Sequence, residues 1–418
     1  MTTTHDAPAQ SVAPPEPDLT PADLIARAEA LSALLVERQA ETEQRSFYSE
    51  QTHKEFAQAG FYRIMVPRRY GGYEFGLDTF LKVTMILARG CASTAWMYCL
   101  GAAHSLIAAT VFEERAQREI FAEGDFIAPM PIAPTGTARR TPEGDWEING
   151  TWAYCSGAPY ASHLIAHALV MGEDGEPPYP LLFVAPRSQW KMLEDWGDML
   201  GLKGSGSHTV TIENGRIPGY CAIEGVHVST VDVTGGTPGL ALHGNPMYGG
   251  APTSSMAMEG AALAVGMAGN ALAAYEEVLR TKTTMAPPFA PRMQDPDYQR
   301  WYGMALTKIA AAEAITMNAI HQWQELCAQG PASFTPDRDL LLAMICGEAA
   351  DLSWFAVENI IHSTAGSGAA RTGERLERAW RDLSTGHTHA GFAVVLKSAI
   401  PRALAQLRFG VPPMVSTH

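Results

Sequence analysis

The feature that most constrains the fold is a change in the spacing of apolar residues along the chain. Apolar residues recur at helical spacing from residue 20 to about residue 122, and short apolar runs separated by turn residues then fill residues 126–225. Long, alanine-rich apolar segments return from about residue 250. The 418 residues exceed what a single simple core accommodates. We therefore predict a mainly α protein with a central β domain between two helical parts.

These changes in apolar spacing also predict the domain boundaries. Residues 1–18 are rich in Pro, Ala and Thr and lack the basic and apolar blocks of a secretory signal, so we expect a disordered segment. An N-terminal helical domain then covers residues 19–125, and a central β domain covers residues 126–230. A C-terminal helical bundle covers residues 231–418.

Helix signals are clear at both ends of the chain. Thr20 is a candidate N-cap, with Pro21 at the first helical position and Asp23 in the first turn. Ala92–Phe112 is apolar on nearly every face, which predicts one buried helix. Four long bundle helices are expected at Ser254–Arg280, Tyr298–Ala328, Pro336–Ser367 and Arg375–Ser384, with loops at Val226–Gly250 and Met285–Pro296.

The central part carries strand and turn signals. Asp145–Asn149 and Thr151–Tyr154 flank Gly150, which suggests two strands separated by a glycine. Further strands are expected at Leu164–Met171, Leu181–Ala185 and His208–Ile212, the last ending at Asn214–Gly215.

Charge and cysteine usage limit the possible functions. The net charge is −14, so an acidic surface would repel nucleic-acid phosphates. The six cysteines are scattered without a CxxC pair, which argues against a disulfide scaffold or a zinc site and predicts reduced core thiols in a cytoplasmic protein. We identify no apolar run long enough to span a membrane, and we expect no metal.

Five short motifs in this order resemble the acyl-CoA dehydrogenase superfamily, over roughly residues 20–410. They are Phe61-Tyr-Arg-Ile-Met-Val-Pro-Arg-Arg-Tyr-Gly-Gly, Ala133-Pro-Thr-Gly-Thr-Ala, Asn149-Gly-Thr-Trp-Ala-Tyr-Cys-Ser-Gly, Gly201-Leu-Lys-Gly-Ser-Gly-Ser and Trp380-Arg-Asp. The resemblance implies an N-terminal helical domain, a β-barrel or sandwich, a four-helix bundle and assembly as a homotetramer.

The same motifs are similar to those of the two-component flavin-dependent monooxygenases within that superfamily. This branch includes hydroxylases of 4-hydroxyphenylacetate and of steroid-derived phenols, and dibenzothiophene monooxygenase. The resemblance implies reduced FMN or FAD supplied by a separate flavin reductase, and O2 as co-substrate. A C4a-(hydro)peroxyflavin would then hydroxylate an aromatic or polycyclic small molecule.

The choice between monooxygenase and dehydrogenase depends on one missing carboxylate. Many dehydrogenases of the superfamily place a catalytic glutamate after the Arg-Asp motif, because abstracting the α-proton of an acyl thioester needs a base. No Asp or Glu follows Asp382 here, and the corresponding distance reaches His389. Isovaleryl-type dehydrogenases instead place the glutamate near Glu259. We interpret Glu259 as a solvated or helix-capping residue, while a dehydrogenase with Glu259 as base, or a non-catalytic flavin-binding or ligand-binding paralogue, remains the alternative.

Three residues are candidates for catalysis. His104 lies on an apolar helix, where a lone histidine is often a core residue. The resemblance instead places it opposite the substrate hydroxyl, where imidazole chemistry suits a phenol proton. By resemblance, Ser156 lies near flavin N5, although a serine at a strand end is also an ordinary turn residue. His389 lies where relatives carry a histidine beside flavin and substrate, and His387 is expected to face solvent or to support it.

The remaining candidates bind the cofactor by resemblance. Trp152 would pack beside the isoalloxazine, although a tryptophan in a strand is commonly core. Ser205 and Ser207 lie in a Gly/Ser loop of the kind that lets the backbone approach an anion. Arg280 and Gly366 would contact flavin phosphate and a neighbouring subunit's cofactor, whereas the simpler reading is a helix-end arginine and a helix-terminating glycine.

Overall fold

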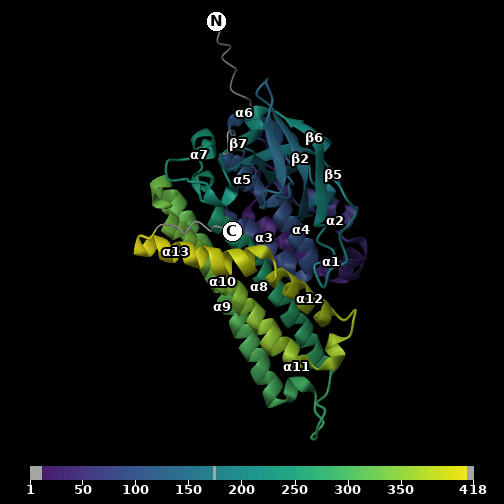
Figure 1. Ribbon diagram of the computed structural model, residues 1–418. Coiled ribbons are helices and arrows are strands. Elements are labelled where there is room, and N and C mark those ends of the chain that lie inside the picture. The colour runs from purple at the N-terminus through teal and green to yellow at the C-terminus, as the bar shows by residue number, and fades with distance from the viewer. Residues whose placement is uncertain (1–11, 173–175, 412–418) are drawn as a thin grey trace.

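The computed structural model describes residues 12–172 and 176–411 (Figure 1). Helices of the first third and a twisted sheet form a broad head, and a bundle of long helices extends from it. This is the predicted mainly α architecture with a central β domain. The two helical parts meet because the bundle helix α8 (Pro252–Thr281) packs along α3 (Leu77–Gly90) and α4 (Ala92–Ala102). Gly266 of α8 closely approaches Ala88 of α3.

The N-terminal part contains six helices. They are α1 (Pro21–Arg45), α2 (Glu50–Gln58), α3 (Leu77–Gly90), α4 (Ala92–Ala102), α5 (His104–Val111) and α6 (Glu114–Ile120). The predicted cap of α1 is confirmed: Thr20 Oγ1 accepts from Asp23 N, and the Asp23 carboxylate accepts from Thr20 N in return. This reciprocal pair satisfies two donors that the first helical turn leaves open.

The segment before α1 differs from the predicted disorder where it is described. Val12 forms a parallel bridge with Tyr70, and Glu16 forms an ion pair with Arg27. The prediction for residues 1–11 lies outside the described residues.

The predicted helix Ala92–Phe112 is buried as expected, but it is two helices. α4 ends at Ala102 and α5 begins at His104. The Ser105 hydroxyl donates to Ala102 O at 2.8 Å, and such local hydrogen bonding competes with the regular helical pattern. The break between the two helices puts His104 in the first turn of α5.

The β domain is one seven-stranded sheet of order β5-β6-β2-β1-β3-β4-β7. Its strands are β1 (Gly136–Arg140), β2 (Trp146–Cys155), β3 (His163–Val170), β4 (Tyr179–Pro186), β5 (Lys191–Met192), β6 (His208–Ile217) and β7 (Ala222–Glu224). Among the described strands, only the β1–β3 pair is parallel.

Two strand predictions were too short. The strands expected on either side of Gly150 are one strand, because a β-bulge at Gly150 keeps the ladder continuous. A side chain at Gly150 would lie 2.5 Å from the Gly136 Cα, so the glycine marks a close approach rather than a break. β6 likewise continues through Asn214, which adopts a left-handed φ of 51°, to Ile217.

The four predicted bundle helices are confirmed as α8 (Pro252–Thr281), α9 (Pro296–Gln329), α10 (Pro336–Ala356) and α12 (Arg375–His387). The first three each begin with proline, whose missing N–H costs nothing in a first turn. α10 continues through a π-helical segment, Val357–His362, into α11 (Ser363–Ala365). The sequence analysis did not predict the π-helix Gly391–Ala399 or α13 (Ile400–Phe409), and the expected loop at residues 226–250 contains α7 (Pro238–His243).

The expectation that no apolar run could span a membrane was wrong by length and composition. Within the described residues, three helical stretches meet those criteria: Ala92–Val111, Pro252–Thr281 and Pro336–Ala365. Of their most apolar windows, 94%, 78% and 44% respectively are buried inside the protein. The six cysteines are all free and buried, as predicted for core thiols.

The α3–α8 contact predicts the effect of adding one methyl group to a helix. Gly266→Ala would gain about 1 kcal/mol of helix propensity, but its Cβ would lie 2.5 Å from the Ala88 Cβ and 2.6 Å from Met85 O. Overpacking of this kind costs about 1–3 kcal/mol, so we expect net destabilisation in urea unfolding. The control is Gly303→Ala on α9, where nothing lies within 4 Å. It should be neutral or stabilising, and equal effects of the two changes would contradict the packing argument.

Candidate functional site

Three buried serines meet where the sheet touches the helices. Ser156 follows β2, and its Oγ lies 2.7 Å from Ser207 Oγ. Ser207 Oγ in turn lies 2.7 Å from Ser205 Oγ, in the loop before β6. Trp96 of α4 donates from Nε1 to Ser156 Oγ at 3.1 Å. The structure thus joins three predicted residues in one hydrogen-bonded chain and adds Trp96, which the sequence analysis did not single out.

The loop that carries Ser205 and Ser207 is seated directly on helix backbones. A side chain at Gly201 would lie 2.1 Å from Arg381 O on α12. At Gly204 a side chain would lie 2.5 Å from Thr42 on α1. Only glycine allows approaches this close, so the Gly/Ser pattern serves packing between domains as well as presenting hydroxyl groups.

Asp382 connects the same loop to α12 through a hydrogen bond. Its buried carboxylate accepts a hydrogen bond from Leu202 N at 2.6 Å. Burial raises the pKa of Asp382 to about 7, against the opposing effects of the Leu202 hydrogen bond and the Arg381 charge. Arg381 forms ion pairs with Glu377 at 2.6 Å and with Glu43 of α1 at 3.0 Å. The Arg-Asp motif therefore joins α1, the serine loop and α12.

His389 also contacts Trp96. The two rings meet edge to face, with centroids 5.4 Å apart. The residue as a whole is exposed, but its ring is packed, and this desolvation lowers the pKa of His389. Nδ1 accepts from Gly391 N at 3.2 Å, which assigns the proton of the neutral ring to Nε2.

A narrow cavity of about 10 Å³ lies beside Trp96, within the bundle. Its walls are largely apolar and come from α4, α8, α10, α12 and the π-helix: Trp96, Gly260, Ala264, Met267, Ala350, Leu383, Gly386, His387 and Phe392. The Phe392 ring rests on Gly260, where a Cβ would lie 2.5 Å from it. Phe392 therefore packs directly on α8 at Gly260.

His387 lines this cavity and is half-buried rather than solvent-facing. Its ring stacks on Trp354, with centroids 5.0 Å apart. Lys397 Nζ lies 3.1 Å from its Nε2, and Asp351 bridges to Lys397 at 2.8 Å. Desolvation and the Lys397 charge lower the pKa of His387. These contacts hold the π-helix against α10.

Glu259 does not match its interpretation as a solvated or capping residue. It lies two turns into α8, and only 3% of the residue is exposed. Burial raises its pKa well above the usual value, and no hydrogen bond or ion pair to it occurs among the described residues. Helix periodicity could have suggested this, because Glu259 shares a face of α8 with Gly266, which contacts α3.

His104 is buried at the start of α5. Its Nδ1 lies 2.7 Å from Ala128 O and donates to it, which leaves Nε2 as the acceptor. Desolvation lowers the pKa of His104 to about 4, so the ring is neutral near pH 7. Within the described chain, no hydrogen bond or ring contact joins His104 to Ser156 or His389.

Trp152 packs inside the sheet. Its Nε1 donates to His167 O at 2.9 Å, and its ring meets Phe183 edge to face. A side chain at Gly136 would lie 2.3 Å from the ring. These contacts agree with the interpretation of Trp152 as a core residue. None of them joins Trp152 to the hydrogen-bonded serines in the described structure.

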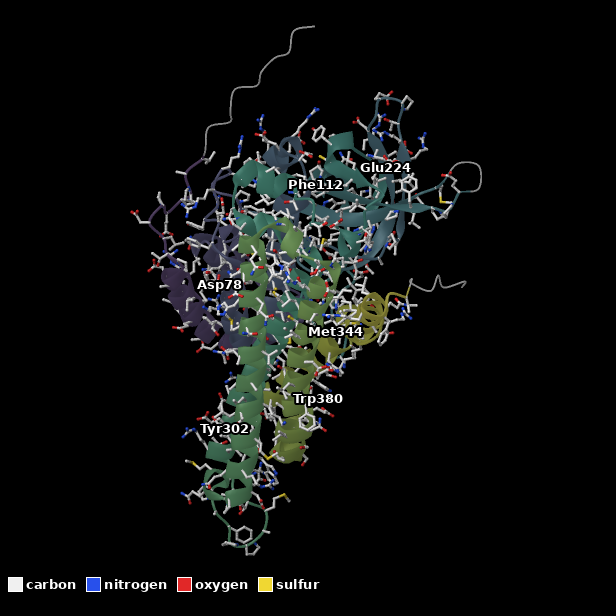
Figure 2. All side chains as sticks on the ribbon, turned by 90° about the vertical axis from the view of Figure 1, so that its left-hand side faces the viewer. Asp78, Phe112, Glu224, Tyr302, Met344 and Trp380 are labelled. Carbon is white, nitrogen blue, oxygen red and sulfur yellow. The ribbon has the colours of Figure 1, made fainter. Side chains whose placement is uncertain are left out.

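Arg280 and Gly366 lie at the far end of the bundle. Arg280 ends α8, about 30 Å along the helix from Gly260 by the usual rise per residue. It pairs with Glu276, which also accepts from Tyr302, and Figure 2 shows Tyr302 near the bundle tip, far from Phe112 and Glu224. Arg292, which the sequence analysis missed, donates to Ala365 O at 2.5 Å beside Gly366. Within one chain, Arg280 and Gly366 therefore lie far from the three serines.

Comparisons with known proteins agree with this fold. The family models "Acyl-CoA dehydrogenase, N-terminal domain" and "Acyl-CoA dehydrogenase, C-terminal domain" match residues 26–120 and 259–394. The chain is 30% identical over 380 residues to a pigment production hydroxylase of Rhodococcus, covering 89% of this chain and 93% of the relative. It is 28% identical over 344 residues to the oxygenase component of an FADH2-dependent resorcinol hydroxylase of Rhizobium, covering 79% and 81%. A 3-HSA hydroxylase structure from Rhodococcus, 24% identical, matches with a TM-score of 0.83 over 94% and 98% of the two chains.

The buried Asp382 predicts a pH-dependent stability. Its pKa is about 7 in the fold against an ordinary 3.8, so the folded state binds the proton more tightly than the unfolded state. This contribution to stability is complete below about pH 4 and is lost as the pH rises to 7. Asp382→Asn keeps an acceptor for Leu202 N but cannot ionise. Its melting temperature should therefore fall less than that of the wild type between pH 5 and 8, measured by circular dichroism.

The control for this experiment is Asp198→Asn, because Asp198 is exposed. It should follow the wild-type profile. An Asp382→Asn curve parallel to the wild type would show that the carboxyl does not titrate in this range.

Proposed function

Because the chain belongs to the acyl-CoA dehydrogenase family, we propose that it is the oxygenase component of a two-component flavin-dependent monooxygenase that hydroxylates an aromatic small molecule. The observation that carries the proposal is that Ser156 and His389 both contact Trp96, Ser156 through a hydrogen bond from its indole N–H and His389 through an edge-to-face ring contact. No carboxylate follows Asp382 along the chain. The names of the hydroxylase relatives give independent support.

The residues present fit a reduced flavin. Neutral hydroxyl groups gather at Ser156, Ser205 and Ser207, which suits the polar edge of an isoalloxazine ring. In the described chain the Thr385 hydroxyl, next to cavity-lining Gly386, is buried without a hydrogen-bond partner. A buried polar group left unpaired is costly, which favours a ligand here. When bound, reduced flavin supplies the two electrons that allow one atom of O2 to enter the substrate.

Ser156 is held from two sides for contact with the cofactor. Trp96 donates to its Oγ, and Ser207 shares a hydrogen bond with it. The hydroxyl therefore has a fixed position without needing a ligand to order it, as a preorganised site requires. Burial of Ser156 and Trp96 also excludes water from this side of the site.

The two histidines serve complementary roles in handling the substrate proton. His104 donates from Nδ1 to Ala128 O, so its free Nε2 accepts a hydrogen bond from a substrate hydroxyl. His389 accepts at Nδ1 from Gly391 N, so its Nε2–H donates to a substrate oxygen. Their lowered pKa values keep both rings neutral near pH 7, which such paired acceptor and donor roles need.

Assembly would complete the cofactor site. Arg280 and Gly366 lie too far from Ser156 within one chain, so we propose that the bundle tip of another copy brings them to the flavin phosphate in a homotetramer. A guanidinium suits this role because it donates to phosphate in a bidentate manner. The cofactor is reduced FMN or reduced FAD, supplied by a separate reductase. The buried free thiols support a cytoplasmic enzyme.

The proposed function is tested by supplying chemically reduced FMN or FAD, 18O-labelled O2 and a panel of phenols. The expected result is a hydroxylated product carrying one labelled oxygen, with no reduction of bound oxidised flavin by acyl-CoA. Ser156→Ala should lower the yield of product per flavin oxidised roughly tenfold, equivalent to losing one hydrogen bond, with the remainder released as H2O2.

The matched control is Ser162→Ala, because Ser162 is a half-buried β-domain serine whose hydroxyl interacts with Ile127 O and His163 and not with the serine chain in the described structure. It should keep the wild-type product yield. Flavin reduction by acyl-CoA, lost in Glu259→Gln, would instead establish the dehydrogenase alternative.

A further inference from the structure

The side chains of the proposed site are buried, so a ligand must displace part of the protein to reach them. Trp96, Ser156 and His104 are 5%, 6% and 4% exposed. The cavity beside Trp96 has a volume of about 10 Å³, which is room for roughly one water molecule. One of the elements that wall this cavity therefore has to move before a larger molecule can pass.

The π-helix Gly391–Ala399 is the wall element with the fewest buried residues. Of its nine residues, only Phe392 and Leu396 are buried, whereas α4 on the opposite wall buries ten of its eleven. A segment with few buried apolar contacts opens at a low free-energy cost compared with the core. π-helical geometry is itself rare and occurs often at functional sites.

Three contacts hold this π-helix on the bundle. The Phe392 ring rests on Gly260 of α8, and Leu396 packs against Gly347 of α10. Lys397 forms an ion pair of 2.8 Å with Asp351 of α10, and the two side chains are 41% and 42% exposed. An ion pair this exposed contributes little to stability. The segment can therefore leave α8 and α10 by losing two apolar contacts and one weak ion pair.

Movement of the π-helix would affect the cavity and His389 together. Phe392 lines the cavity that leads to Trp96, so its departure from Gly260 removes one wall. Gly391, the first residue of the π-helix, donates from its backbone N–H to His389 Nδ1 at 3.2 Å. Closure of the segment thus both covers the cavity and fixes the orientation of the His389 ring.

We propose that the π-helix Gly391–Ala399 is a gate that swings away from α8 and α10 to admit the small-molecule substrate past the cavity to Trp96. The walls of this passage are largely apolar, with Ala264, Met267 and Leu383, which suits a small uncharged molecule better than the phosphate of a flavin. The proposal rests on the proposed function only in taking the admitted molecule to be the substrate.

The first test measures opening in the full-length protein without any ligand. Leu396→Cys places a thiol on the buried face of the gate, and its labelling by iodoacetamide is followed by mass spectrometry. The new thiol should react at least ~10-fold faster than native Cys99, which is buried on α4 and becomes accessible only on global unfolding. Adding Asp351→Asn should raise the labelling rate roughly twofold to fivefold, the contribution of an exposed ion pair.

The matched control for Asp351→Asn is Glu313→Gln. It removes the ion pair between Arg89 and Glu313, which has the same length of 2.8 Å and similar exposed fractions of 44% and 41% but joins α3 to α9. In the Leu396→Cys background it should leave the labelling rate unchanged.

The second test locks the gate with a reversible disulfide. A Cβ at Gly347 would lie 3.6 Å from the Leu396 Cβ, which is within the range for a disulfide. Gly347→Cys with Leu396→Cys is made together with Cys346→Ser, which removes a competing thiol. Uptake of radiolabelled phenol is then measured by rapid gel filtration. Locking before phenol is added should lower uptake at least ~10-fold, whereas locking afterwards should retain the bound phenol, and reduction should abolish both effects.

The order of locking separates a gate from a distorted site, because distortion would lower phenol binding in either order. The proposal is overturned if the new thiol reacts no faster than Cys99, if Asp351→Asn has no more effect than Glu313→Gln, or if uptake is the same in both orders. Flavin and O2 take no part in these measurements. Order-dependent uptake without hydroxylation would reject the monooxygenase alone, and hydroxylation with order-independent uptake would reject the gate alone.

Discussion

The seating of the 201–207 loop on α12 is the contact on which the rest of the site depends. Gly201 lies against the Arg381 backbone, and Asp382 accepts from Leu202 N at 2.6 Å. This contact fixes where β6 begins and therefore where Ser207 meets Ser156. The same contact therefore positions the Ser156 and Ser207 hydroxyl groups next to Trp96.

Burial tunes the titratable groups around this contact. Desolvation lowers the pKa values of His104 and His389 and raises those of Asp382 and Glu259. All four shifts favour the uncharged form, as a low-dielectric interior requires. A neutral, mostly apolar site is well suited to an aromatic substrate and to chemistry that must exclude water.

Local signals predicted the helices well and the strands less well. Caps such as Thr20 and first-turn prolines act over a few residues, so they can be recognised in the sequence. The long β2 strand was divided at Gly150, because the reason for that glycine is a close approach to Gly136 of another strand. Glu259 was misplaced for a similar reason: a charged residue is normally exposed, and only the packing of α8 against α3 and α4 reverses that expectation.

The sequence by itself determined the order of the domains, the reduced core thiols, the serines and the absence of a carboxylate after Asp382, because each depends on residue type and spacing alone. The tertiary structure decided which of these residues meet. It joined Ser156 to Ser205, Ser207 and Trp96, placed Trp152 in the sheet core and separated Arg280 from them all. The physical reason is that hydrogen bonds and desolvation act through space, between residues that the chain holds far apart.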